Sequence, residues 1–160
     1  MIVVSNMISN SLVCDILEYI NKNINEKITI DDLTYEFNYN RYYLMKLFKK
    51  ELDISIVNYI NYKRIYNSLS SLRENKSILM IALNNGFYSQ EYYAEIFKKV
   101  IGTNPITYKS FIKNRHLSKQ KEEDILITNL INLEDIMNKV NNYIKRRKTD
   151  SKIKSIFKQI

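Results

Sequence analysis

The sequence is poor in the residues that interrupt helices or build covalent and metal-bound cores. Its 160 residues include two Gly, one Pro, one Cys and one His, and no Trp. A single cysteine excludes an intramolecular disulfide framework, and without a His/Cys cluster a zinc site has no ligand set. The scarcity of Gly and Pro, with 45% apolar residues, indicates a helical protein with short connections.

Long apolar runs and a targeting segment are also lacking. The N-terminus MIVVSNMISN has no basic region, and no stretch reaches the roughly 18 apolar residues of a membrane span. We therefore expect a cytoplasmic protein. Its net charge of +8 favours a polyanionic partner, because clustered Lys and Arg gain affinity for phosphate backbones by releasing counterions. A generic lysine-rich surface would carry the same charge.

One sequence pattern occurs twice, at an offset of 49 residues. NRYYLMKLFKK, which begins at Asn40, returns as SQEYYAEIFKK, which begins at Ser89. Asn40 or Ser89 can cap a helix, and Ser55 or Asn104 can open the next one. An apolar stripe at helical spacing follows each first cap, and we expect both stripes to be buried: Tyr43, Leu44, Leu47 and Phe48 in one copy, and Tyr92, Tyr93, Ile96 and Phe97 in the other.

A short helical segment precedes each copy, at about residues 31–37 and 77–83. Each segment is followed by a residue that can adopt a left-handed conformation, Asn38 or Gly86. Four positions earlier stands a small residue, Thr34 or Ala82, which lets two helices cross closely. A short helix, a tight turn and a second helix form a helix-turn-helix unit, and the sequence predicts two of them.

At this point the sequence resembles the DNA-binding region of the AraC/XylS family of bacterial transcription regulators. The resemblance spans about residues 10–113 and implies an all-α fold. In that fold, two helix-turn-helix subdomains, about 30–51 and 77–100, are joined by a long linker helix, about 55–73, within a set of seven helices. The family signature I-A-x-x-x-G-F-x-S-x-x-Y-F-x-x-x-F-K-K, then G-x-x-P-x-x-Y, is matched here by Ile81, Ala82, Gly86, Phe87, Ser89, Tyr92, Tyr93, Phe97, Lys98, Lys99, Gly102, Pro105 and Tyr108.

The resemblance implies a sequence-specific transcription regulator that binds double-stranded DNA. Its two recognition helices, about 41–51 and 90–100, would enter successive major-groove segments, so that one chain covers two half-sites about 34 Å apart. RNA polymerase is a second candidate partner. No cofactor and no catalysis are expected.

We expect the outward face of the first recognition helix to contact DNA. This face carries Arg41, Tyr42, Met45, Lys46 and Lys49. Arg41 or Lys46 could donate to guanine O6 and N7, while Tyr42 and Met45 could pack on a thymine methyl group. The resemblance implies a polar or aromatic side chain at Tyr42 and a base-reading side chain at Lys46.

The second recognition helix departs from the family pattern. Its outward positions are Gln90, Glu91, Ala94, Glu95 and Lys98, and two carboxylates facing phosphates weaken binding unless one accepts a hydrogen bond from cytosine N4. Gln90 is then the best base-reading candidate of this helix. The two glutamates favour an alternative function, a protein-interaction module in which one or both helix-turn-helix units no longer read DNA.

Other reactive residues lack partners for chemistry. Cys14 lies beside an apolar helical stripe and is expected to be a structural thiol, whereas His116 has no acidic or Ser partner at a recognisable spacing. An enzyme fused to this module, for example a DNA-repair protein, would need a reactive Cys or a metal set. Arg64, on the linker helix, matches a family Arg that we expect to be structural.

The segment 117–160 lies beyond the resemblance and is expected to be a C-terminal helical extension. After a charged hinge near 118–124, apolar residues recur at intervals of four and three: Leu126, Leu130, Leu133, Met137, Val140 and Ile144. This helix, about 124–144, either docks on its own chain, which favours a monomer, or mediates a dimer. The last ten residues form a basic amphipathic segment or a disordered tail. With about ten residues before the first helix, no N-terminal sensor domain is expected.

Overall fold

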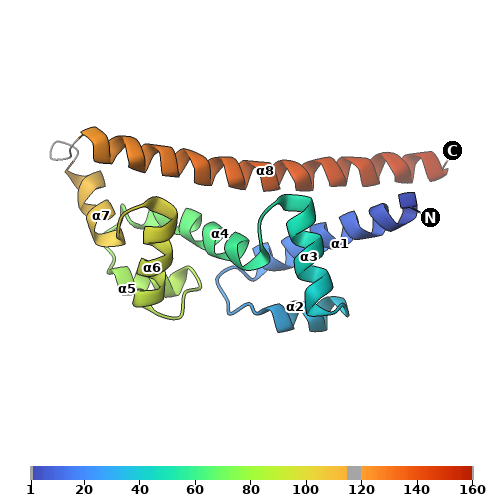
Figure 1. The fold of residues 1–160 in the computed structure, drawn as a ribbon, viewed down its shortest axis with the longest axis horizontal. Helices are drawn as coiled ribbons and strands as arrows, with labels where there is room; N and C mark the ends of the chain where they lie inside the picture. Colours follow the sequence, from blue (N-terminus) through green and yellow to red (C-terminus); the bar gives the residue numbers. More distant parts are fainter. Residues whose placement is uncertain (1, 115–119, 160) are drawn as a thin grey trace. The chain divides into compact units, whose positions relative to one another are not determined.

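The computed structural model describes residues 2–114 and 120–159, and these residues form helices and short connections only (Figure 1). The helices of the described chain are α1 (Ile2–Lys22), α2 (Ile30–Phe37), α3 (Arg41–Leu52), α4 (Ile56–Ser71), α5 (Ile78–Asn84), α6 (Gln90–Ile101), α7 (Pro105–Lys113) and α8 (Gln120–Gln159). The all-α prediction is confirmed, and α2 to α7 lie within a few residues of the expected segments.

The chain divides into two compact units. Unit 1 comprises Met1–Lys22, Ile28–Ile56 and Ile136–Ile160, and unit 2 comprises Asn23–Lys27 and Val57–Asp135. Unit 1 therefore holds α1, α2, α3 and the second part of α8. Unit 2 holds most of α4, then α5, α6, α7 and the first part of α8. Each unit contains one helix-turn-helix pair.

Unit 1 is built on the apolar stripe of α1. The apolar stripe beside Cys14 is buried, and Val13, Ile16 and Leu17 have no exposed surface; its members are Leu12, Val13, Ile16, Leu17 and Ile20. They form the core of unit 1 together with Leu33 of α2 and with Leu44 and Phe48 of α3, which also have no exposed surface. Burying apolar surface in this way is the main stabilising term in folding. The start of α1 differs from the expectation, because the helix begins at Ile2 rather than near residue 10.

Aromatic rings fill the core of unit 2. The Tyr93 ring lies 5.1 Å from Phe87 and 5.6 Å from Phe97, and the Phe97 ring lies 5.4 Å from Tyr108. The edge-on and tilted geometries of these contacts suit the charge distribution of aromatic rings. The Tyr93 hydroxyl and the buried Ser68 hydroxyl are hydrogen-bonded at 3.0 Å, so the buried Tyr93 phenol has a hydrogen-bond partner. Asn104 caps α7, as predicted, and Pro105 occupies its first turn.

The C-terminal helix α8 is longer than expected. The hinge prediction is wrong for residues 120–124, which already belong to α8, and its remaining part falls outside the described residues. Leu126 and Leu133 are buried in unit 2, and Met137 and Val140 are buried in unit 1, so most of the predicted stripe packs within the chain. The last residues are helical as far as Gln159, with Ile153 and Ile156 exposed. Among the described residues, no helix is long and apolar enough to cross a membrane.

The turn residues Asn38 and Gly86 both adopt the predicted left-handed conformation, with φ of 54° and 80°. They differ in the space around them. A Cβ atom at Gly86 would lie 2.6 Å from the carbonyl oxygen of Ile24, whereas Asn38 is exposed and carries its own side chain.

We therefore expect Gly86→Ala to be more destabilising than Asn38→Ala. Asn38→Ala adds no β-carbon and removes only the short polar side chain that favours the left-handed conformation, at a cost of about 1 kcal/mol. Gly86→Ala adds a β-carbon in the left-handed conformation and a backbone clash, for a total of about 2–4 kcal/mol. Thermal unfolding followed by circular dichroism would measure both variants. Equal losses of stability would show that the close approach of Ile24 has no energetic weight.

Candidate nucleic-acid interface

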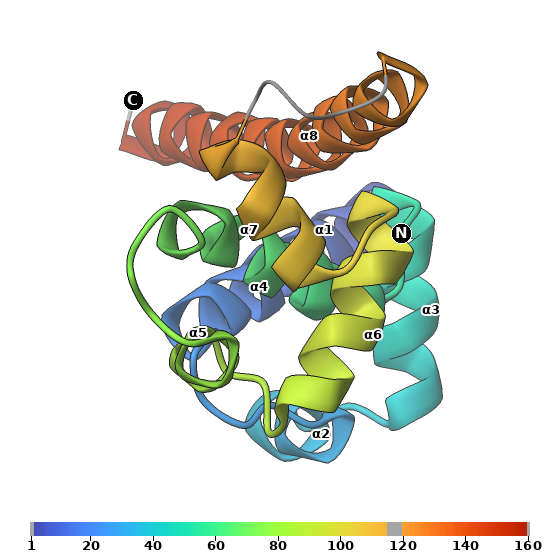
Figure 2. The same cartoon turned by 90° about the vertical axis from the view of Figure 1, so that its left-hand side faces the viewer.

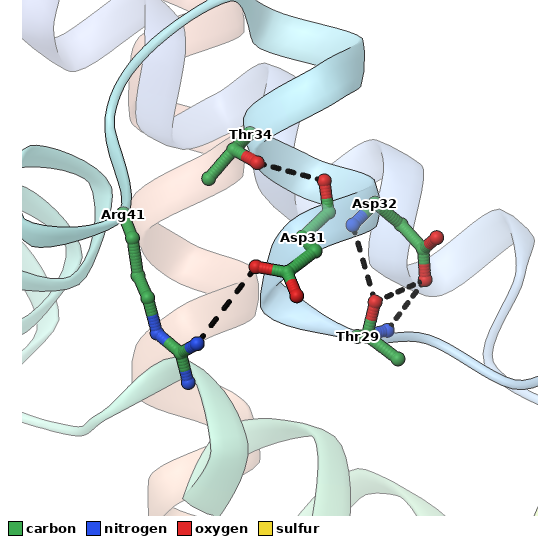
Figure 3. A network of polar contacts seen from close by, with 5 residues as sticks. All are labelled: Thr29, Asp31, Asp32, Thr34 and Arg41. Carbon is green, nitrogen blue, oxygen red and sulfur yellow. Dashed lines mark hydrogen bonds and ion pairs between the residues drawn. The ribbon is translucent and has the colours of Figure 1, made fainter.

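The first helix-turn-helix pair, α2 and α3, is held by side-chain caps at both helix starts. Thr29 Oγ1 accepts a hydrogen bond from the Asp32 amide at 3.1 Å, and Asp32 Oδ2 accepts one from the Thr29 amide at 2.7 Å, which together form a capping box (Figure 3). Asn40 Oδ1 accepts from the Tyr43 amide at 2.8 Å and caps α3 as predicted. The start and orientation of α3 are thus determined locally.

The buried and exposed faces of α3 carry the residues that the sequence predicts, with one exception. Leu44, Leu47 and Phe48 are buried. Tyr43 was also expected in the core, but 38% of its surface is exposed, so that part of the prediction is wrong. Its ring stacks on Tyr39 instead, 5.1 Å between centroids. The phenol lies on the surface because the stack lets the polar hydroxyl keep its contact with water.

The candidate DNA contacts of α3 are all exposed. Tyr42 is the most exposed of the apolar ones, at 73%, and the full set is Arg41, Tyr42, Met45, Lys46 and Lys49. The Lys46 ammonium lies 5.6 Å from the centre of the Tyr42 ring, a cation–π contact on the surface of the helix. This face therefore presents three cations and an aromatic ring.

Arg41 also has a carboxylate near it. Its guanidinium lies 3.8 Å from Asp31 Oδ1, and both side chains are well exposed (Figure 3). An exposed pair of this kind contributes little to stability, because water screens it. The guanidinium can therefore exchange Asp31 for a phosphate or a base edge at small cost.

The second pair, α5 and α6, repeats this construction (Figure 2). Ser77 and Ser89 cap the two helices, and the Ser89 hydroxyl accepts from the Tyr92 amide at 3.1 Å. Tyr93, Ile96 and Phe97 are buried as predicted, and Ile81 and Ala82 of α5 are buried as well. Tyr92, the fourth member of the predicted stripe, is half-buried and accepts a hydrogen bond from Asn61 at 3.1 Å.

The outward face of α6 differs from that of α3 in charge and in exposure. Glu91, Glu95 and Lys98 are exposed, whereas Gln90 and Ala94 are half-buried. The outward face of α6 therefore exposes two carboxylates and one ammonium, whereas the outward face of α3 exposes three cations. Lys99, next to Lys98, is exposed as well.

A stacked tyrosine pair stands at the start of each recognition helix and was not anticipated. Tyr88 stacks on Tyr92 with 4.8 Å between ring centroids, as Tyr39 stacks on Tyr43. The first ring of each pair precedes the helix cap by one residue, and Tyr88 is 77% exposed. The repeat offset of 49 residues relates Tyr39 to Tyr88 as well as Tyr43 to Tyr92. Extending the aligned repeat by one residue at its start would have found both pairs.

Arg64 is structural, as expected, and lies away from solvent. Its Nε donates to the Ile24 carbonyl at 2.9 Å, its Nη2 donates to the Glu26 carbonyl at 2.6 Å, and its guanidinium lies 5.8 Å from the centre of the Phe87 ring. Burial lowers the pKa of Arg64 from its ordinary value, and the two carbonyl acceptors stabilise its positive charge.

The reactive residues show no arrangement for catalysis in the described chain. Cys14 is half-buried, and burial, followed by the nearby carboxylate of Asp15, raises the pKa of its thiol. A thiol with a raised pKa is a weak nucleophile at neutral pH. No group of three His, Cys, Asp or Glu side chains among the described residues could hold a metal ion. His116 lies outside those residues.

Comparison with known proteins agrees with this construction. A family model described as a helix-turn-helix domain matches residues 33–110. The chain is 33% identical over 104 residues to the probable transcription factor PqrA of Proteus vulgaris, an alignment that covers 63% of this chain and 85% of PqrA. The chain therefore belongs to the AraC-type helix-turn-helix family of bacterial transcription regulators.

Two further matches are a longer relative and an isolated domain. The chain is 30% identical to the uncharacterized HTH-type transcriptional regulator YbfP of Bacillus subtilis, over 66% of this chain and 36% of YbfP, so it spans about a third of that protein. Among solved structures, the C-terminal domain of AraT, a response regulator from Geobacillus stearothermophilus, is 26% identical with a TM-score of 0.60. That alignment covers 68% of this chain and 89% of the AraT domain.

Proposed function

We propose that the chain binds double-stranded DNA in a sequence-specific manner through α3 and α6 and thereby regulates transcription. The observation that carries the proposal is the outward face of α3, where Arg41, Lys46 and Lys49 surround the exposed Tyr42 and Met45. We assign the DNA-binding domain to residues 10–113 and an extension to residues 117–160. RNA polymerase is the further partner that a regulator of transcription would engage.

The chemistry of α3 suits the major groove. Arg and Lys donate to guanine O6 and N7, and an apolar or aromatic side chain packs on the thymine methyl group. Lys46 is the base-reading candidate, since it lies in the middle of the exposed face, beside the Tyr42 ring. Lys49, in the last turn, suits a phosphate.

The two stacked tyrosine pairs would add polar contacts at the edges of the groove. Each pair stands where a recognition helix begins, and Tyr39 and Tyr88 keep a large part of their rings exposed. Phenolic hydroxyls donate readily to phosphate oxygens, and such contacts orient the protein on the duplex without reading its sequence. A stacked ring loses little conformational entropy when it makes such a contact.

A second candidate function, a protein-interaction module, is favoured by the surface of unit 2. Leu79, Met80 and Leu83 of α5 are each about half exposed, and Glu91 and Glu95 of α6 are exposed. Exposed apolar side chains of this kind are typical of protein contacts. In this alternative, one or both helix-turn-helix units no longer read DNA, and the charge of α6 makes it the first candidate. DNA repair is not proposed, because Cys14 has the environment of a structural thiol.

The first test concerns Lys46. Genome-wide footprinting would first find a DNA site that the protein protects. Lys46→Ala should weaken binding to that site by about 1–3 kcal/mol and relax the preference at one base pair, because a donor to guanine is lost. Lys139→Ala, which removes an exposed lysine from α8, is the matched control for charge alone. Binding titrations on the site found by genome-wide footprinting would measure both. An unchanged base preference in Lys46→Ala would remove Lys46 from the base-reading set.

The second test concerns Glu95. If its carboxylate only repels phosphate, Glu95→Gln should tighten binding to all sequences about equally. If it accepts from cytosine N4, the variant should lose discrimination at one C·G pair instead. We expect the uniform gain, and Glu134→Gln, at an exposed glutamate of α8, controls for the change in net charge. Affinities for a set of singly substituted sites would separate the two outcomes.

The third test concerns the oligomeric state. Because Leu126, Leu133, Met137 and Val140 are already buried within one chain, most of the predicted heptad stripe of α8 is not available to a second copy. We expect a monomer of 19.2 kDa at every concentration examined by sedimentation equilibrium. A mass that doubles with increasing concentration would show that α8 is a self-association helix, and the DNA site would then be a pair of sites.

A further inference from the structure

In unit 2, α8 holds the C-terminal end of recognition helix α6. The last carbonyl groups of a helix have no partner inside the helix. The carbonyl of Ile101, the final residue of α6, accepts a hydrogen bond from Asn129 Nδ2 of α8 at 2.9 Å. Helix α6 belongs to the second helix-turn-helix pair, whereas α8 lies outside residues 33–110, which match the family model. The bond therefore joins a proposed DNA-reading helix to an element outside that region.

The residue after α6 is shaped for this contact. Gly102 has φ of +91°, and a Cβ atom at this position would lie 2.7 Å from Asn129 Nδ2 and 3.8 Å from Ile125. Its amide donates to the Lys98 carbonyl at 2.9 Å and closes the last turn of α6. Glycine at this position therefore permits both the turn and the close approach of α8.

In unit 1, α8 holds the C-terminal turn of recognition helix α3. Glu51, in that last turn, has a side chain that is only 19% exposed. Its Oε2 accepts a hydrogen bond from the Tyr143 hydroxyl at 3.3 Å, and the Arg147 guanidinium lies 4.0 Å from the same oxygen. Arg147 also lies over the Tyr143 ring, 5.2 Å from its centre.

The Tyr143 hydroxyl stays a donor under ordinary conditions. Burial, followed by the negative charge of Glu51, raises the pKa of Tyr143 to about 12. Since the phenol is protonated at neutral pH, its hydroxyl can donate to Glu51 under the conditions in which DNA binding would be measured. An ion pair between Lys148 and Glu18 at 2.7 Å ties the same part of α8 to α1.

We propose that α8 is a positioning helix for DNA binding, and that Asn129, Tyr143 and Arg147 hold the ends of the two recognition helices in their reading positions. The inference rests on the proposed function. Apolar packing is not directional. Hydrogen bonds have a preferred length and angle, so those at the helix ends resist small shifts of a helix in addition to the packing. A base-reading side chain needs that control, because a misplacement of about 1 Å loses its bonds.

The test uses the full chain and reads the two half-sites separately. Lys46→Ala and Gln90→Ala first show which half of the protected DNA belongs to α3 and which to α6. Asn129→Ala should then weaken protection of the α6 half by about fivefold, the affinity equivalent of one hydrogen bond, and leave the α3 half nearly unchanged. Tyr143→Phe, which removes only a hydroxyl, should weaken the α3 half by a similar factor.

Asn132→Ala is the matched control, since Asn132 is an exposed asparagine of α8 in the same unit as Asn129. Circular dichroism of every variant checks that the helices and the melting midpoint are retained. Equal loss of protection in both half-sites would mean that α8 acts only through overall stability. No loss of protection in either half-site would mean that these α8 contacts do not affect DNA binding. Each result overturns this inference while leaving the proposed function intact. A wild-type chain that protects no DNA contradicts the proposed function, and this inference fails with it.

Discussion

The architecture of unit 2 depends on the hydrogen bonds that the buried Arg64 guanidinium donates to backbone carbonyls. A buried charge is costly unless its hydrogen bonds are satisfied, and here the carbonyls of Ile24 and Glu26 satisfy it while the Phe87 ring covers one face. The bonds bring the 23–27 loop against Gly86, where a β-carbon would strike both Ile24 and Arg64. The turn of the second helix-turn-helix pair is therefore restricted to glycine, whereas the first uses an exposed Asn38.

One folding plan thus carries two different surfaces. In both pairs a side-chain cap starts the recognition helix, a left-handed residue forms the turn and a stacked tyrosine pair stands at the entrance. The exposed face of α3 is cationic, while that of α6 carries Glu91 and Glu95. Because the caps and buried stripes determine the fold, the outward positions of the two copies were free to diverge in charge without changing it.

The sequence predicted the features that depend on local chemistry. The caps at Asn40, Ser89 and Asn104 and the left-handed Asn38 and Gly86 could be found because each acts within a few residues. The two helix-turn-helix pairs followed from these signals and the family resemblance. The exposure of the outward face of α3 could be predicted as well, since helical periodicity separates it from the buried stripe.

Other features depend on contacts between distant segments, and periodicity does not show these. Tyr43 falls on the apolar stripe by spacing, yet stacking with Tyr39 keeps it at the surface. A charged stretch can be helical or irregular, so residues 120–124 were assigned to the hinge and α8 was expected to begin later. Asn129 and Tyr143 gave no signal at all, because an amide or a phenol on a long polar helix has no distinctive pattern until its partner is known.

The surface position of the α3 side chains separates two properties that many proteins must adjust together. Substitutions at exposed positions outside caps and cores usually change stability by no more than about 0.5 kcal/mol. Tyr42, Met45 and Lys46 are such positions, whereas Leu44, Leu47 and Phe48 on the other side of the same helix are buried. The outward side chains of α3 can accordingly be replaced, by selection or by design, through a few codons, while the buried side of the helix stays under an independent constraint.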